Sequence, residues 1–317
     1  MLKKITSIFF NQKSKLNQPN SKSLIPDNKI ILNNSFNKNN PQVVLNQGDT
    51  IGIIAGSREL PISFAKTASE LGLSVCAVCF EGETSKQIEN FTKQVCWIKL
   101  GQLGKIINFF KKHGVANAVF IGGISRVKSF KDVSLDMRGA LFMAKLRSTK
   151  DDVILRGLAD ELANEDIEVL DSTVFAKEHL VPSGVLTKTK PSKEQLRDIE
   201  VGREAIRALS EQHIGQLVVI KDGVVTAVEA VEGSDEAIRR GGKLGHSGTV
   251  VVKCAKVNQD MRFDVPVIGI NTIRAMLEVS ASVLALEAGR CLVMDKDKLL
   301  ALANENGLVI IGCEPLV

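Results

Sequence analysis

Charged side chains gather at two places in the second half of the chain, and each place follows an apolar run. In the first, Val228–Glu236, the apolar run ends, Gly233 provides a turn and Asp235 opens a helical pattern. The dipole of a helix favours the ionised form of a carboxylate at its N-terminus. Such a carboxylate can ligate a hard divalent cation or orient a water molecule. Asp235 is therefore our candidate catalytic residue, although Ser234 as an N-cap with Asp235 behind it also fits plain helix capping.

The second place is the segment from Lys253 to Asp264, which directly follows another apolar run. Cationic side chains stabilise phosphoryl oxygens, and carboxylates hold the metal ions that often accompany them. This density of charge after an apolar strand favours a phosphate site, with a solvated charged loop as the alternative. The candidate substrate-binding residues of this segment are Lys253, Lys256, Gln259 and Arg262.

Glycine-bearing turns follow three apolar runs in the first half of the chain. A turn between a strand and a helix points backbone N–H groups and a helix dipole at an anion. In doubly wound sheets, ligands lie at the carboxyl ends of the strands, so we expect the three turns to converge there. None of them has the spacing of a dinucleotide fingerprint or a P-loop, and each alone also fits a simple tight turn. The candidate substrate-binding residues are Gly56, Ser57, Gly101, Gln102, Gly104, Gly122 and Gly123.

Strands and helices that alternate along the chain must position these side chains. From Thr50 to Leu170, short apolar runs alternate with helical patterns of about ten residues, which predicts βαβ units and a parallel sheet. A Pro- and Gly-containing segment without apolar period follows and is the predicted linker. Beyond it, a long helical pattern and an Asp222-Gly223 hairpin signal open a second α/β domain. The predicted divisions are 1–46 as a leader, 47–180, 181–192 as the linker and 193–317.

Composition excludes several classes of protein. The net charge of +5 arises in residues 1–46, which hold seven Lys and one acid, so the folded body is close to neutral. Nucleic-acid binding needs a basic face on the fold, and we therefore expect no nucleic-acid partner. The leader is rich in Asn and Lys and is predicted to be disordered.

Other patterns narrow the function further. The longest apolar runs fall short of the roughly 18 residues that a membrane-spanning helix needs. The six Cys lie mostly in apolar runs and are predicted to be buried and reduced, as in a cytosolic protein. The four His have no metal-ligand spacing, and the chain lacks the G-x-S-x-G string of serine esterases.

Taken in order, these strings resemble the LpxI-type UDP-2,3-diacylglucosamine pyrophosphatases of lipid A biosynthesis, from about residue 48 to the C-terminus. Each string alone is unspecific, and the ordered set carries the resemblance. Further matching residues are Gly289 and Arg290 after Leu286-Glu-Ala. The main strings are Ile54-Ala-Gly-Ser-x-x-Leu-Pro61, Leu100-Gly-Gln-Leu-Gly104, Gly122-Gly-Ile-x-Arg126, Asp151-Asp-x-x-Leu-Arg156, Val228-Glu-Ala-x-Glu-Gly-Ser-Asp235 and Lys253-x-x-Lys-x-x-Gln-Asp-x-Arg-x-Asp-x-Pro266.

The resemblance implies a fold and an activity. The fold is a Rossmann-like parallel-sheet N-terminal domain, a linker and a distinct C-terminal α/β domain. The activity is hydrolysis of UDP-2,3-diacylglucosamine, a nucleotide-activated glycolipid, to UMP and 2,3-diacylglucosamine 1-phosphate. The family's essential aspartate maps onto Asp235, with Ser234 in place of Thr. A cytoplasmic enzyme in peripheral contact with the inner membrane is also implied.

Magnesium dependence is a further implication. Our own hypothesis is that Asp235 holds the ion or aligns the water, with Glu232 or Asp260 as the second carboxylate. The chain departs from the family at Arg58, usually Gly, and at Val127, usually Pro. Arg58 puts a close backbone approach to phosphate in doubt. The leader has no counterpart in the family core.

Two other functions stay open at this point. A non-catalytic nucleotide-lipid binding protein could use the same fold, because fold does not fix function. A nicotinamide-dependent oxidoreductase is disfavoured, because the dinucleotide fingerprint is missing. A homodimer is left open as the commonest oligomer.

Overall fold

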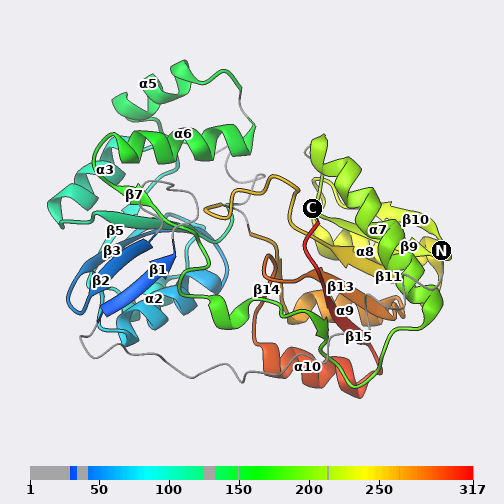
Figure 1. Ribbon diagram of the computed structural model, residues 1–317. Helices are drawn as coiled ribbons and strands as arrows, with labels where there is room; N and C mark the ends of the chain where they lie inside the picture. The colour runs from blue at the N-terminus through cyan, green and yellow to red at the C-terminus, as the bar shows by residue number, and fades with distance from the viewer. Residues whose placement is uncertain are drawn as a thin grey trace.

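The structure is a computed structural model, and it describes residues 29–33, 42–124, 133–148, 150–212, 214–263 and 265–316. Figure 1 shows two α/β units beside each other, one coloured blue to green and the other yellow-green to red. The expected fold class, a parallel-sheet N-terminal unit followed by a distinct C-terminal α/β unit, is confirmed.

A parallel sheet forms the centre of the first unit. Its strand order within the described residues is β5-β4-β3-β6-β7, and every neighbouring pair is parallel. The chain runs outward from β3 to β5 and returns to β6 on the other side of β3. This reversal creates the position at which doubly wound sheets bind ligands. The strands are β3 (Thr50–Ala55), β4 (Ser74–Phe80), β5 (Gln94–Ile98), β6 (Asn117–Ile121) and β7 (Glu168–Val169).

Helices cover this sheet because each buries an apolar stripe. In α3, for example, Leu103, Ile106, Ile107 and Phe110 are buried, which is the spacing of one helix face. Gly114 follows α3 with a φ of 66°, the left-handed conformation in which many helices end. The helices are α2 (Leu60–Glu70), the 3₁₀ helix η1 (Lys86–Phe91), α3 (Leu103–Lys112), α5 (Met137–Lys145) and α6 (Asp151–Ala163).

Part of the predicted leader is folded. Strands β1 (Lys29–Asn33) and β2 (Gln42–Asn46) pair antiparallel, and Leu32, Val43 and Leu45 are buried in the core of the first unit. The prediction of disorder is wrong for these two strands, because alternate apolar side chains of β2 provide one face that the core can bury. The rest of segment 1–46 lies outside the described residues.

The second unit contains a mixed sheet with the order β10-β9-β11-β13-β15-β8 in the described chain. Strands β11, β13 and β15 are parallel, while β10, β9 and β8 run antiparallel to their neighbours. A small parallel pair, β12–β14, lies apart from this sheet. The strands are β8 (Gly184–Val185), β9 (Leu217–Lys221), β10 (Val224–Val228), β11 (Val250–Lys253), β12 (Val267–Ile268), β13 (Val283–Glu287), β14 (Leu292–Val293) and β15 (Val309–Cys313).

The helices of this unit include α7, which begins with the capping box of Ser192 and Gln195. The hairpin predicted at Asp222 and Gly223 is confirmed between β9 and β10. Both residues have positive φ, 49° and 79°, as a two-residue hairpin turn requires. The helices are α7 (Lys193–Glu211), α8 (Ser234–Gly245), α9 (Ile270–Glu278) and α10 (Lys296–Glu305), and the 3₁₀ helix η2 (Lys177–His179) precedes this unit in the chain.

The segment predicted as a linker, 181–192, contributes to the second unit. It contains β8, and the hydroxyl of Thr187 accepts a hydrogen bond of 2.9 Å from the backbone N–H of Ile310 in β15. The segment therefore forms the edge of a sheet and is not a free connection. The sequence pattern does not predict strand β8, because two Pro and one Gly interrupt any apolar alternation in this segment.

The two units share apolar cores through the segment between β11 and β12. The ring of Phe263 packs edge-on against Phe120 of β6, with centroids 5.3 Å apart. The N–H and hydroxyl of Ser172 both donate to the carbonyl of Met261, at 3.0 and 2.8 Å. Val265 is buried in the core of the first unit. The predicted phosphate segment thus lies where the two units meet.

All six cysteines are unpaired, and five are buried, as expected. Burial raises the pKa of the Cys79 and Cys291 thiols to about 12. These thiols therefore stay protonated and unreactive at neutral pH. None of the described helices combines the length and apolar content that crossing a membrane requires.

Candidate active site

Helix α8 places Asp235 in its first turn. Gly233, with φ 85°, stands at the cap position, and the helix begins at Ser234. The expectation that Ser234 is the N-cap is therefore wrong by one residue. Its hydroxyl is instead engaged by side chains from other elements. Asp235 and Glu236 occupy the first turn as predicted, where the helix dipole favours negative charge.

The hydroxyl of Ser234 joins the start of α8 to the end of β11. It accepts a hydrogen bond of 2.7 Å from Nζ of Lys253 and donates one of 2.7 Å to Oε1 of Glu229. Lys253 is only 6% exposed, so its ammonium group depends on such partners. The backbone N–H of Gln216 donates to the other oxygen of Glu229 at 3.2 Å. The two predicted charge centres are therefore in direct contact.

Asp235 is held from a second helix. Its Oδ1 accepts a hydrogen bond of 3.0 Å from the hydroxyl of Thr272, in the first turn of α9. In the described part of the chain, Oδ2 of Asp235 has no hydrogen-bond partner. The half-buried carboxylate of Asp235 therefore has one oxygen fixed and one oxygen available. Its position is set by helix α8, which packs closely on β9, since a Cβ on Gly241 would stand 2.5 Å from Cβ of Val219.

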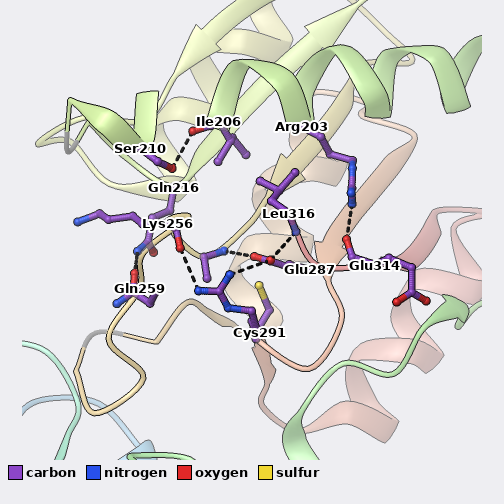
Figure 2. A network of polar contacts seen from close by, with 12 residues as sticks. Arg203, Ile206, Ser210, Gln216, Lys256, Gln259, Glu287, Cys291, Glu314 and Leu316 are labelled. Carbon is purple, nitrogen blue, oxygen red and sulfur yellow. Dashed lines mark hydrogen bonds and ion pairs between the residues drawn. The ribbon is translucent and has the colours of Figure 1, made fainter. Parts of the chain in front are cut away.

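Gln259 fixes the segment that follows β11. Its Oε1 accepts a hydrogen bond of 3.0 Å from the side chain of Gln216, and its Nε2 donates one of 2.8 Å to the carbonyl of Phe263. Figure 2 shows Gln216 and Gln259 facing each other, with the Lys256 side chain pointing away from them. The predicted substrate contact Gln259 thus has a structural role in the loop.

Asp260 and Arg262 lie together and neutralise each other. Arg262 donates from Nη2 to Oδ2 of Asp260 at 2.8 Å and from Nε to Oδ1 at 3.0 Å. Nε of Arg156, in α6 of the first unit, lies 3.7 Å from the same carboxylate. This fork geometry is strong and planar, and it leaves Asp260 occupied by two cations.

Glu232 is also bound to an arginine. Its carboxylate accepts a hydrogen bond of 2.6 Å from Arg240, and its own backbone N–H together with Arg240 lowers the pKa of Glu232. Among the described residues, no group of three or more His, Cys, Asp or Glu side chains could hold a metal ion. The three predicted metal carboxylates therefore do not form one cluster. Asp235 alone fits magnesium, which commonly binds one or two carboxylates plus substrate phosphates.

Two of the glycine turns meet at the reversal of strand order. The N–H and hydroxyl of Ser57 donate to the carbonyl of Gly123 at 2.7 and 2.8 Å. A Cβ on Gly56 would collide with that carbonyl, which explains why glycine is needed there. Gly56, Ser57, Gly122 and Gly123 are therefore brought together between β3 and β6.

The third turn lies apart from these two. Gly101, Gln102 and Gly104 follow β5, which β4 separates from β3, so roughly 10 Å of sheet lies between the turns. Oε1 of Gln102 accepts hydrogen bonds from the N–H of Lys99 and from Nζ of Lys105, at 3.0 and 3.1 Å. The expected convergence of three turns holds for two of them, because the strand order places β5 at the edge.

The departure at Arg58 has a visible consequence. This residue has φ 74°, a left-handed conformation that favours glycine, so the usual Gly of the family fits the backbone better. Arg126, Val127 and Asp264, which the matching strings include, lie outside the described residues.

Sequence reasoning missed several polar side chains at this site: Gln216, Glu229, Thr272 and Glu287. Glu229 stands inside a quoted string but carries no local signal of its contact with Ser234. Thr272 occupies an ordinary amphipathic helix, and only the packing of α8 on α9 brings it to Asp235.

Asp171 provides a pH-dependent test of the contact between the units. Burial raises the pKa of Asp171, hydrogen bonds from Thr173 oppose this, and nearby Asp260 raises it further. A carboxyl with a raised pKa in the folded state contributes stability below its unfolded pKa and loses that contribution as pH rises through the folded value. Asp171→Asn keeps the Oδ1 acceptor for Thr173 but removes the charge that burial disfavours at pH 7.5. We therefore expect the Tm of this variant to exceed that of wild type by a few degrees at that pH.

The gain should shrink as the pH is lowered toward the ordinary aspartate pKa. Thermal unfolding at both pH values measures it, with Asp160→Asn on the exposed side of α6 as the matched control. A lower Tm for Asp171→Asn at pH 7.5, or an equal gain at both pH values, would contradict the prediction.

Comparisons with known proteins agree with the arrangement of the two units. The LpxI N-terminal domain family matches residues 50–179, and the LpxI C-terminal domain family matches residues 182–311. The chain is 29% identical over 276 residues to UDP-2,3-diacylglucosamine pyrophosphatase LpxI of Caulobacter vibrioides, and this match covers 84% of the chain and 98% of that protein.

Likenesses to solved structures are weak. N5-carboxyaminoimidazole synthetase of Staphylococcus aureus matches with a TM-score of 0.24 and 17% identity, over 56% of this chain and 39% of that one. Phosphoribosylglycinamide synthetase of Anaerococcus prevotii matches with a TM-score of 0.25 and 12% identity, over 60% of this chain and 42% of that one. The chain spans about two fifths of each solved protein, and scores at this level support no conclusion.

Proposed function

The chain belongs to the LpxI family, and from this premise we propose that it hydrolyses the pyrophosphate bond of UDP-2,3-diacylglucosamine, releasing UMP and 2,3-diacylglucosamine 1-phosphate. The observation that carries the proposal is the contact of Lys253 with Ser234, the residue beside Asp235. It places a cation beside the first turn of α8, the turn that also carries the oriented carboxylate of Asp235. Attack of water on a charged phosphorus needs both kinds of group. The alternative of a non-catalytic binding protein gives no reason for this pair.

The described residues can divide the chemistry between them. Asp235, fixed through Oδ1 by Thr272, orients a water molecule with its second oxygen. The water oxygen forms a bond to phosphorus while the water gives a proton to Oδ2 of Asp235. The bond from that phosphorus to the bridging oxygen breaks, and the bridging oxygen leaves with the other phosphate as an anion. Lys253 and Lys256 stabilise the negative charge that develops on the phosphate oxygens. Arg262 contributes less, because Asp260 already neutralises it.

We propose magnesium as the cofactor, with Asp235 as the protein carboxylate that holds it. When bound, the ion would neutralise the charge of the pyrophosphate. The observation that supports this assignment is the chemistry of the donor set. Glu232 and Asp260 are paired with arginines, whereas Asp235 has no arginine partner among the residues that the structure describes. We also propose that the protein binds peripherally to the cytosolic face of the inner membrane and that it forms a homodimer. Vesicle sedimentation and gel filtration test them.

The test is release of UMP from UDP-2,3-diacylglucosamine by the wild-type protein. With magnesium present we expect turnover, and an excess of EDTA should lower the rate at least about tenfold, because an unshielded pyrophosphate repels the incoming water oxygen. Restoring magnesium should restore the rate. UDP-N-acetylglucosamine, which lacks the acyl chains, is the control substrate. Binding of the lipid substrate without any release of UMP would favour the non-catalytic alternative.

A further inference from the structure

Glu287 is a buried charged residue that the chemistry above does not use. It is the last residue of β13 and is 0% exposed. Figure 2 shows its carboxylate at the centre of a polar network. Oε2 accepts a hydrogen bond of 2.7 Å from the N–H of Ala255, and Oε1 accepts from the N–H of Leu316 at 2.9 Å and from Nη1 of Arg290 at 3.1 Å. These three donors compensate the removal of the charge from water.

Arg290 extends the network to the same loop. Its Nη2 donates a hydrogen bond of 3.0 Å to the carbonyl of Lys256, and the thiol of Cys291 contacts the carbonyl of Lys253 at 3.6 Å. The backbone from Lys253 to Lys256 is therefore held at three points, from the end of β13 and from the segment that follows it. The residues held there include Lys253 and Lys256, whose ammonium groups the proposed function assigns to the phosphate oxygens.

A stabilising role alone accounts poorly for this ion pair. Burying an ion pair costs much of what its attraction gains, and well-packed apolar residues often stabilise a fold equally well. Apolar residues, however, could not accept from the Ala255 N–H or donate to the Lys256 carbonyl. Glu287 and Arg290 are therefore needed to fix the conformation of the loop Lys253–Lys256.

We propose that Glu287 and Arg290 are positioning residues for the pyrophosphate site, acting through the backbone of Lys253–Lys256. This inference rests on the proposed function. A displacement of about 1 Å in a catalytic group can cost about 100-fold in rate. Arg290→Lys keeps the charge but loses the planar fork that reaches Glu287 and Lys256 together. Its kcat falls about 10- to 100-fold, while its KM changes less than about threefold.

A double-mutant cycle separates positioning from stability. The kcat for UMP release is measured for Arg290→Lys, for Lys256→Ala and for both together, each corrected for the folded fraction. Because Arg290 acts through Lys256, the double variant loses little more than Lys256→Ala alone. Arg203→Lys is the matched control, since Arg203 donates to the carbonyl of Glu314 and, in the part of the chain that the structure describes, makes no hydrogen bond or ion pair with Lys253–Lys256. It keeps kcat within about twofold.

Hydrogen exchange of the Glu287→Gln variant provides a second test of the positioning role. This variant keeps the side-chain shape and loses the charge, so the amide of Ala255 exchanges at least about tenfold faster than in wild type, whereas Arg203→Lys leaves that amide unchanged. Additive losses in the cycle, an unchanged kcat for Arg290→Lys, or an unaltered Ala255 exchange overturn the positioning role. A wild-type protein that releases no UMP overturns the proposed function instead, and the positioning role falls with it.

Discussion

Asp235→Asn is expected to lower the kcat for UMP release about 1,000-fold, within the roughly 10²–10⁴-fold that a positioned general acid or base contributes. Asparagine has the same shape and keeps an oxygen that can accept from Thr272, so α8 and α9 stay in contact. It cannot accept a proton or supply a full negative charge. KM should change little if Asp235 acts mainly in the transition state. Steady-state kinetics with saturating magnesium, together with calorimetric binding of the lipid substrate, measure both quantities.

Glu236→Gln is the control for Asp235→Asn. Glu236 occupies the same first turn of α8, so its substitution removes an equal charge from the same helix dipole. Its carboxylate is exposed and pairs with Arg239 at 2.7 Å, away from the Ser234 network. We expect its kcat to stay within about twofold of wild type. An Asp235→Asn enzyme that retains a third or more of the wild-type kcat would remove Asp235 from the mechanism.

The elements that the sequence predicts are those with local signals. Strands β3, β4 and β6 are continuous apolar runs, as buried parallel strands are. Asp222-Gly223 defines its hairpin because both residues adopt positive φ. By contrast, β8 and β12 have two residues each, and their pairing with β15 and β14 is a property of the assembled fold. No local pattern could predict them.

In the candidate site, too, the sequence predicts the features that depend on neighbouring residues and not those that depend on the assembled fold. The position of Asp235 at a helix start is local, and the sequence predicts it. The pairing of Glu232 is not local, because its arginine, Arg240, lies 8 residues away. Asp260 binds Arg262 two residues away, but its second cation, Arg156, belongs to the other unit. Thr272 lies 37 residues from Asp235, and Glu287 lies 32 residues from Ala255. Contacts over such separations depend on how helices and strands pack, which residue types and spacing do not determine.

Lys253→Met is expected to lower kcat about 100- to 1,000-fold, the cost typical of removing one donor that stabilises transition-state charge. Methionine fills the apolar surroundings of this residue, which is 6% exposed, and so preserves the packing at the end of β11. It leaves Ser234 with its hydrogen bond to Glu229, so the start of α8 keeps a partner. The loss should therefore lie in the chemical step, and single-turnover release of UMP measures it directly.

Lys221→Met is the matched control for this second loss. Lys221 also ends a strand of the same sheet. Because β9 is antiparallel to its neighbour β11, Lys221 and Lys253 lie at opposite ends of this strand pair. The ammonium group of Lys221 contacts only the exposed Asp222 among the ion pairs of the described chain, at 3.7 Å. An exposed pair of this kind contributes little, so kcat should stay near the wild-type value. Equal losses in the two variants would mean that net charge, rather than the cation beside Ser234, governs the rate.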